Sequence, residues 1–166
     1  MPLLSLLFFC VIKACDVGNL YNILDMEGIN ILRNSVTKQG TNILFFAASE
    51  IDGIHYCDIG LTLSSLIKDR IWNRNLSIIT NDALDSIIRK NVRNEESIGN
   101  YIAIRNIGIL FEPELKLNVH DKLRKYSREQ TLVVNMEGRV QKNYFLFQGD
   151  HKYSISLTDI TYKIIP

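Results

Sequence analysis

The stretch YIAIRNIGILFEPELKLNVHDKLRKYSREQTLVVN, residues 101–135, carries the clearest fold signal in this 166-residue chain. It begins with a short apolar run, YIAI (101–104), which is typical of a buried strand, and it ends in a second such run, TLVVNM (131–136). Between them, a turn at 112–114 precedes a charged segment with helical spacing over 115–128. Two strands joined by a helix of this length predict a crossover unit, and therefore a parallel sheet covered by helices.

The segments on both sides extend this alternation of strands and helices. We expect strands at 29–33 (INILR) and 54–59, helices at 61–71 and 76–92, and a terminal pair of strands at 143–147 and 153–157. Residues 42–50 fit either a helix or a second strand, because their ILFF core suits both. The chain is therefore predicted to be α/β and three-layered, with a mainly parallel sheet and an antiparallel edge at the carboxyl end.

The composition is that of a globular protein, with 46% hydrophobic and 22% charged residues. Nineteen Lys and Arg against eighteen Asp and Glu give a net charge of +1. This balance argues against a protein built mainly to coat nucleic acid or acidic membrane, although a local basic patch remains open. Three cysteines, Cys10, Cys15 and Cys57, are too few for a disulfide framework or a four-ligand metal set, which favours a reduced cytoplasmic location. We expect one domain over residues 1–166.

The amino-terminal stretch PLLSLLFFCVI, residues 2–12, is almost wholly apolar and is followed by Lys13. It is shorter than the roughly 20 residues that span a bilayer, and no Lys or Arg precedes it as in a signal peptide. Apolar residues at helical spacing predict a helical segment within residues 1–27 that is buried against the core. A partner interface and a targeting signal are the alternatives. Residues 28–166 form the predicted α/β core.

Residues 35–42 (SVTKQGTN) lie after one predicted strand and before a possible helix, where a phosphate-binding loop would be found. In the motif G-x-x-x-x-G-K-[ST], backbone amides surround the phosphates, the lysine reaches the terminal phosphates and the hydroxyl binds magnesium. Gly40 is the one key position that this chain keeps. Ser35 stands in place of the first glycine, Thr41 in place of the lysine, and Asn42 in place of the Ser or Thr. Lys38 lies two residues before Gly40, so its side chain starts from the wrong part of the loop to act as the motif's lysine.

Residues 101–138 resemble the BrxF family of small P-loop ATPase-like proteins from BREX phage-defence systems. The matching features, in chain order, are Asn106-Ile107, Leu110 to Pro113, Ser127-Arg128, Thr131 to Val134 and Gly138. Residues 54–66 also look like the family's second strand and the helix after it, so that the resemblance covers about residues 29–153. It implies a P-loop NTPase-like fold, ATP as a cofactor, and other protein subunits of a defence complex as partners.

The resemblance breaks down at the residues that would carry the chemistry. In the family, an Asp at a strand end organises magnesium and a later Glu activates water. Arg105 and Gly108 stand at these positions, beside Asn106. We therefore predict no catalytic residue, no cofactor and a non-catalytic accessory or scaffold subunit. The alternative is a nucleotide-binding protein or weak ATPase completed by a partner, for which Lys38 and Asp58 are the nearest candidates.

The helix predicted at 115–128 is locally basic, and Tyr126 lies among its cations. A second alternative is therefore a nucleic-acid-binding module. Asp121 and Glu129 dilute the charge, so an exposed charged helix face is the simpler interpretation. No histidine lies at a metal-ligand spacing, and we predict no metal site. The candidate nucleic-acid contacts are Lys116, Lys122, Arg124, Lys125 and Arg128.

Overall fold

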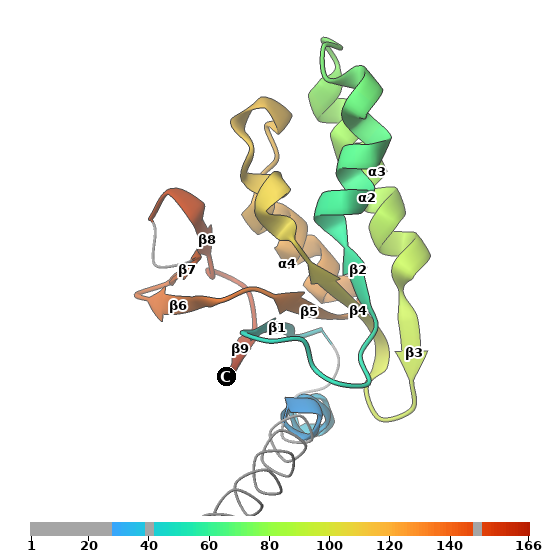
Figure 1. The fold of residues 1–166 in the computed structure, drawn as a ribbon. Helices are drawn as coiled ribbons and strands as arrows, with labels where there is room; N and C mark the ends of the chain where they lie inside the picture. The colour runs from blue at the N-terminus through green and yellow to red at the C-terminus, as the bar shows by residue number, and fades with distance from the viewer. Residues whose placement is uncertain (1–27, 39–41, 148–150) are drawn as a thin grey trace, which may run out of the picture.

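The computed structural model describes residues 28–38, 42–147 and 151–166. A mainly parallel sheet forms the centre of the fold (Figure 1), with five parallel strands in the order β2-β4-β5-β1-β9 and β3 antiparallel to the first half of β4. The predicted α/β class with a mainly parallel sheet is confirmed. The strands of this sheet are β1 (Leu44–Ala47), β2 (Tyr56–Asp58), β3 (Arg93–Glu95), β4 (Gly99–Arg105), β5 (Thr131–Asn135) and β9 (Tyr162–Ile165).

The strand register brings the ends of the parallel strands to one edge of the sheet. Ala47 at the end of β1 pairs with Asn135 at the end of β5, and Asp58 at the end of β2 pairs with Arg105 at the end of β4. We call this the carboxyl edge. In parallel α/β sheets ligands bind outside this edge, because the loops that leave the strands meet there.

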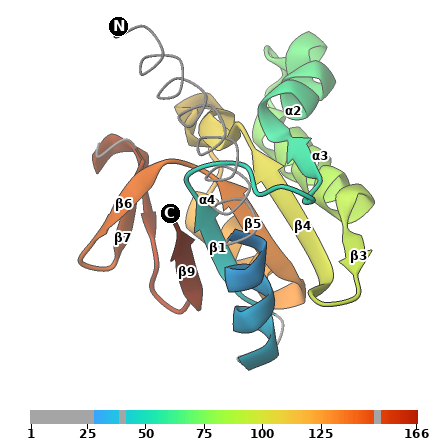
Figure 2. The same ribbon diagram turned by 60° about the horizontal axis from the view of Figure 1, so that its bottom comes forward.

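Helices cover both faces of the sheet, as the predicted three layers require. The helices α2 (Ile59–Ile67), α3 (Leu76–Asn91) and α4 (Val119–Glu129) lie on one face. The helix of residues 28–38 lies on the other (Figure 2). A short helix η1 (Lys68–Arg70) ends α2, and the α2–α3 hairpin projects past the carboxyl edge (Figure 1). Two further short helices, η2 (Ile107–Phe111) and η3 (Pro113–Leu115), connect β4 to α4.

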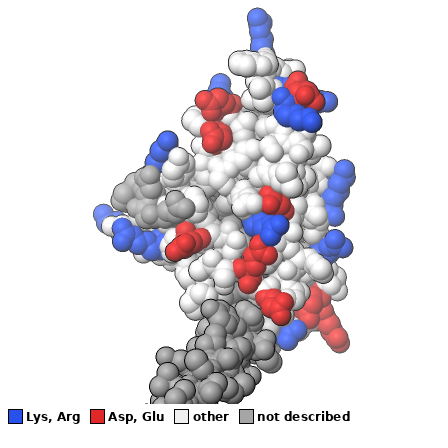
Figure 3. Space-filling view, in the orientation of Figure 1, with Lys and Arg blue, Asp and Glu red and all other residues white. Residues whose placement is uncertain are grey.

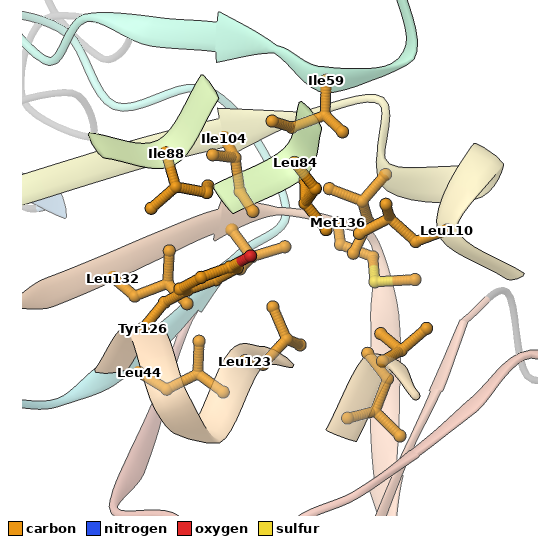
Figure 4. Close-up of a cluster of buried hydrophobic side chains, with 14 of the residues drawn as sticks. Leu44, Ile59, Leu84, Ile88, Ile104, Leu110, Leu123, Tyr126, Leu132 and Met136 are labelled. Atoms are coloured by element: carbon orange, nitrogen blue, oxygen red, sulfur yellow. The ribbon is translucent and has the colours of Figure 1, made fainter. Parts of the chain in front are cut away.

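Alternate residues of the strands build two separate cores. Leu44 and Phe46 of β1 face the α2–α3–α4 layer, whereas Phe45 and Ala47 face the helix of residues 28–38. In Figure 4, Leu123 and Tyr126 of α4 lie beside strand residues of the first core and below Leu84 and Ile88 of α3. Four consecutive buried residues make β1 a strand that is covered on both sides, as parallel sheets require.

A second, antiparallel sheet adjoins the first core. Its order is β6-β7-β8, with the strands β6 (Gly138–Gln141), β7 (Tyr144–Phe147) and β8 (Ser154–Ser156). The ring of Phe145 in β7 stacks on Phe46 in β1, with 3.9 Å between the ring centroids. The predicted antiparallel pair near the carboxyl end is thus present, and a short helix η4 (His151–Tyr153) precedes β8.

The predictions for residues 29–33 and 42–50 need correction. Residues 28–38 are helical rather than a strand, because Leu32, Ser35 and Val36 recur at helical spacing and are buried on one face. Of the two alternatives for residues 42–50, the strand is the observed one, as β1. The order strand–loop–helix expected around residues 35–42 is therefore wrong: residues 35–38 are the end of a helix, and Asn42 precedes the strand β1.

Most other predicted elements agree with the structure within a few residues. The strands at 54–59 and 131–136 and the helices at 61–71 and 76–92 correspond to β2, β5, α2 with η1, and α3. The helix expected at 115–128 begins only at Val119, because Asn118 caps it by accepting the backbone N–H of Asp121. The strands β3, β6 and β9 were missed. The helix predicted within residues 1–27 lies outside the described residues.

Candidate functional site

An ion cluster at the carboxyl edge joins the loops after three strands. Arg105 Nη1 lies 2.6 Å from Glu50 Oε1, and its Nε lies 3.5 Å from Asp58 Oδ2. The side-chain amide of Asn106 donates to the same Asp58 oxygen at 2.6 Å. Figure 3 shows that acidic and basic side chains alternate on this face of the molecule. We call Glu50, Asp58, Arg105 and Asn106 the Arg105 cluster.

Asp58 has a second, structural task in this cluster. Its Oδ1 accepts the backbone N–H of Leu61 at 2.8 Å and so caps the start of α2. Gly60, in the first turn of α2, lies so close to β4 that a Cβ there would be 2.9 Å from the Asn106 carbonyl oxygen. Asn106 itself has a positive φ of 55°, a conformation that Asn tolerates better than most residues. The close approach of α2 to Asn106 therefore holds both Asp58 oxygens in place.

The charges of the cluster satisfy one another. The hydrogen bond and the negative charge of Glu50 raise the pKa of the Arg105 guanidinium, and Asp58 adds to this effect. All three charged side chains remain partly exposed, with side-chain exposures of 41% for Arg105, 46% for Glu50 and 20% for Asp58. A guanidinium at this point repels a divalent cation, and both carboxylates already have a cationic partner.

A cavity of about 410 Å³ opens beside the cluster. It lies where β1 and β5 end and where η2 begins, and Asn106 is common to the cavity and the cluster. The side-chain amide of Asn135 lines it and donates to the Ala47 carbonyl at 3.3 Å. The polar lining thus consists of two amides and one carboxylate. The remaining lining residues are mainly apolar, and the full set is Ala48, Asn106, Ile107, Gly108, Ile109, Asn135, Met136, Glu137 and Phe147.

This arrangement suits an uncharged ligand better than a magnesium–phosphate group. The amides offer hydrogen-bond donors and acceptors, whereas the nearest cation, Arg105, is held by Glu50 and Asp58. Within residues 28–38, 42–147 and 151–166, no group of three or more His, Cys, Asp or Glu side chains is placed to hold a metal ion. Recognition of a triphosphate at this edge would require the Arg105 pairs to open.

The predicted nucleotide loop lies at the opposite end of β1 from the Arg105 cluster. Ser35 is buried in the helix of residues 28–38, where its hydroxyl donates to the Ile31 carbonyl at 2.6 Å and accepts from Lys163 at 2.9 Å. Lys38 is exposed at the end of that helix, and Asn42 precedes β1 with a φ of 82°. A strand rises roughly 3.3 Å per residue, so about 15 Å of chain separates Asn42 from the carboxyl edge.

The two halves of the predicted degenerate site therefore do not come together. Gly40 and Thr41 lie outside the described residues. Arg105 does end a central strand, as the resemblance implied, with Asn106 after it and Gly108 in η2. Arg105 thus lies at the carboxyl edge, whereas Ser35, Lys38 and Asn42 lie before β1.

The basic residues of α4 do not form one free cationic surface. Lys122 and Lys125 both bind Asp85 of α3, with N–O distances of 2.8 and 2.9 Å. The hydroxyl of Tyr126 donates to the same carboxylate. Burial alone raises the pKa of Asp85, but the hydrogen bonds from Lys122, Tyr126 and Lys125 outweigh it and hold this pKa well below its usual range.

The remaining predicted nucleic-acid contacts are dispersed. Arg124 pairs with Asp121 at 3.2 Å one turn earlier in α4. Lys116 follows η3, and Arg128 lies in the last turn of α4; both are exposed. The structure thus uses two of the five predicted contacts to attach α4 to α3, which leaves little continuous positive charge for a phosphate backbone.

Sequence reasoning missed Glu50, Asn135 and Glu137. Asn135 ends β5, and Glu50 and Glu137 follow the ends of β1 and β5. Glu50 is recognisable as such only once ILFF is taken as a strand, and its contact with Arg105 depends on strand order. No family model matches the chain, and no curated protein or solved structure matches it significantly. None of the helices within the described part of the chain is long and apolar enough to cross a membrane.

Proposed function

We propose that this chain is a non-catalytic subunit that acts by binding another protein. The observation that carries the proposal is the position of Arg105, which lies at the carboxyl edge in contact with both nearby carboxylates. Hydrolysis of a nucleoside triphosphate needs a metal-binding acid and a phosphate-binding lysine at this edge. Here the acids are paired with a cation, and Lys38 belongs to the other end of the sheet.

The distribution of exposed apolar side chains supports protein binding. Among the residues that the structure describes, eight large hydrophobic side chains are exposed, and five of these fall within residues 61–78. Exposed apolar side chains concentrated on one helical hairpin are a feature of interaction sites, whereas scattered single ones are common on any protein surface. The five are Leu61, Leu66, Ile71, Trp72 and Ile78, all on or between α2 and α3.

The resemblance of residues 101–138 to the BrxF family favours a phage-defence complex in the cytoplasm as the setting. This narrower proposal depends on the strand–helix–strand segment and on the motifs in it, since the loop at 35–42 no longer contributes. Partners would then be other protein subunits of that complex, and no cofactor would be needed.

The test combines nucleotide binding with co-purification. Isothermal titration of the purified chain with magnesium and ATP should give no saturable heat, and a tagged chain expressed in its native cells should recover a partner protein in stoichiometric amount. Micromolar ATP binding that Arg105→Ala changes at least tenfold, while the exposed control Arg139→Ala does not, would overturn the proposal. Arg139 lies on β6, away from the Arg105 cluster.

A second candidate function is the binding of a small polar molecule in the 410 Å³ cavity beside Asn106. The size is within the range of ligand clefts, about 300–1,000 Å³, and the amides of Asn106 and Asn135 supply directional hydrogen bonds. ATP belongs to this alternative as a ligand held without magnesium. Thermal unfolding of the chain with and without ATP or adenosine would detect it as a raised midpoint that Asn135→Ala abolishes.

A further inference from the structure

An apolar groove lies between the tip of the α2–α3 hairpin and the η2–η3 segment. It has a volume of about 530 Å³. Its apolar walls come from two separate parts of the chain, the hairpin on one side and the segment before α4 on the other. We call it the tip groove, and its apolar lining consists of Ile67, Ile71, Trp72, Leu76, Ile109 and Leu115.

Trp72 at the rim of this groove is the most exposed large hydrophobic residue that the structure describes. Its relative exposure is 93%, and Ile71 beside it is 50% exposed. A tryptophan ring is among the side chains that contribute most to protein–protein affinity once they are buried. Leaving both side chains in water costs hydrophobic free energy that a partner would recover.

The two rims of the tip groove carry opposite charge. Glu112 and Glu114 line it on the η3 side, and Lys68 lines it on the hairpin side. In the part of the chain that the structure describes, none of these three forms an ion pair, and Arg70 and Arg74 near the hairpin tip also have none. Figure 3 shows acidic side chains with a basic one beside them at the η3 side, a mixed group of acidic and basic side chains at the hairpin, and uncharged surface between them.

This pattern discriminates between kinds of partner. A phosphate backbone or an anionic membrane lying in the groove would face Glu112 and Glu114, which repel it. A small molecule would find few polar groups within the apolar walls to fix its orientation. An amphipathic helix fits both features, because its apolar side chains recur at one face and charges of both signs can flank that face.

Building on the proposed function, we propose that the tip groove binds one amphipathic α-helix of a partner protein. Its apolar face contacts Ile71 and Trp72, a basic flank faces Glu112 and Glu114, and an acidic flank faces Lys68. Since the rim charges are exposed, they select the partner and its orientation, while the apolar contacts supply most of the affinity.

The chain carries its own reporter for this interaction, because Trp72 is its sole tryptophan. The probes are designed helical peptides of about 18 residues, long enough for a stable amphipathic face. They share one leucine face and differ only in their flanks: one peptide has Lys on one flank and Glu on the other, and the second has Glu on both. Binding of the mixed-flank peptide should shift Trp72 emission to shorter wavelength with saturation.

The charges at the two rims predict which of the two peptides each form of the chain binds more tightly. The wild-type chain should bind the mixed-flank peptide roughly threefold to tenfold more tightly than the Glu-flanked one, a range typical of partly exposed charge pairs. The variant Glu112→Lys/Glu114→Lys, in which both rims are basic, should prefer the Glu-flanked peptide. Ile71→Ser should weaken binding at least fivefold, whereas the matched control Ile164→Ser, an exposed isoleucine of β9 outside the groove, should not.

Several results would overturn the proposal. These are an unshifted emission with both peptides at millimolar concentration, equal effects of Ile71→Ser and Ile164→Ser, or no exchange of preference. A single-stranded oligonucleotide could instead quench Trp72 emission. If its affinity exceeds that of the peptides and falls steeply with salt concentration, the partner is a nucleic acid. A shift on raising the protein concentration alone would identify a second copy. If Ile71→Ser still recovers the co-purified partner from cells, the groove assignment fails while the proposed function stands.

Discussion

Replacing Asp85 with alanine should lower the free energy of unfolding by about 2–4 kcal/mol. Asp85 joins α3 to α4, because it accepts hydrogen bonds from Lys122, Lys125 and Tyr126. Tyr126 is 2% exposed, so its hydroxyl would lose its partner inside the protein at a cost of about 1–3 kcal/mol. The side chain of Lys122 is 14% exposed and would add about 1 kcal/mol, while Lys125, at 48%, adds less.

Chemical denaturation followed by far-ultraviolet circular dichroism measures this change. Arg124→Ala is the matched control, because it breaks an exposed pair within α4 and should change the unfolding free energy by no more than about 0.5 kcal/mol. Tyr126→Phe alone should cost about 1 kcal/mol, and the double variant should cost less than the sum of the two single changes. If Asp85→Ala is no more destabilising than Arg124→Ala, this carboxylate does not hold α4 on α3.

Three further predictions concern the same core. Because the folded state depresses the pKa of Asp85, its contribution is fully present above the unfolded value of about 3.9 and is lost as pH falls from there through the lower folded pKa; the stability difference between wild type and Asp85→Asn should therefore narrow progressively between about pH 5 and pH 2 in denaturant titrations. Gly138→Ala should destabilise by about 1–3 kcal/mol or more, since the new Cβ would lie 2.5 Å from the Leu146 carbonyl; unchanged stability would contradict this close approach. Phe145→Ala should cost about 3–5 kcal/mol, because the buried ring stacks on Phe46; a calorimetric loss below about 1 kcal/mol would show that β7 contributes little to the core.

The crossover unit at residues 101–135 was predictable because its two strands are short apolar runs between clear polar breaks. Such runs are buried on both faces in a parallel sheet, so their composition identifies them without alternation. Edge strands lack this signal. β3 (Arg93–Glu95) has no apolar residue, and β9 (Tyr162–Ile165) is too short to be separated from the surrounding turn residues.

The exchange of helix and strand before residue 48 had a different cause. Three of the five residues in INILR are isoleucine or leucine, and local propensity therefore assigns this segment to a strand. Leu32, Ser35 and Val36 reveal the helical period only when the window extends to residue 38. The run ILFF is equally apolar, and only its burial on both faces in the assembled sheet decides for a strand.

The contacts of Arg105 were beyond the reach of the sequence for a topological reason. Glu50 is 55 residues away from Arg105 along the chain. The two side chains meet because β1 and β4 lie in the same sheet with only β5 between them. No local pattern encodes strand order. The type of each element could be inferred from its own residues, whereas the partners at the carboxyl edge depend on how all the strands are arranged.

The same correction that moves the predicted loop also accounts for the charge of the site. Because most of the run ILFF lies in β1, Asn42 lies at the amino end of this strand, and the chain that leaves its carboxyl end carries Glu50 instead of a glycine-rich loop and a lysine. Glu50 then pairs with Arg105, which also contacts Asp58 at the same edge. The carboxyl end of β1 is therefore followed by an anion, where a phosphate-binding loop would supply a lysine.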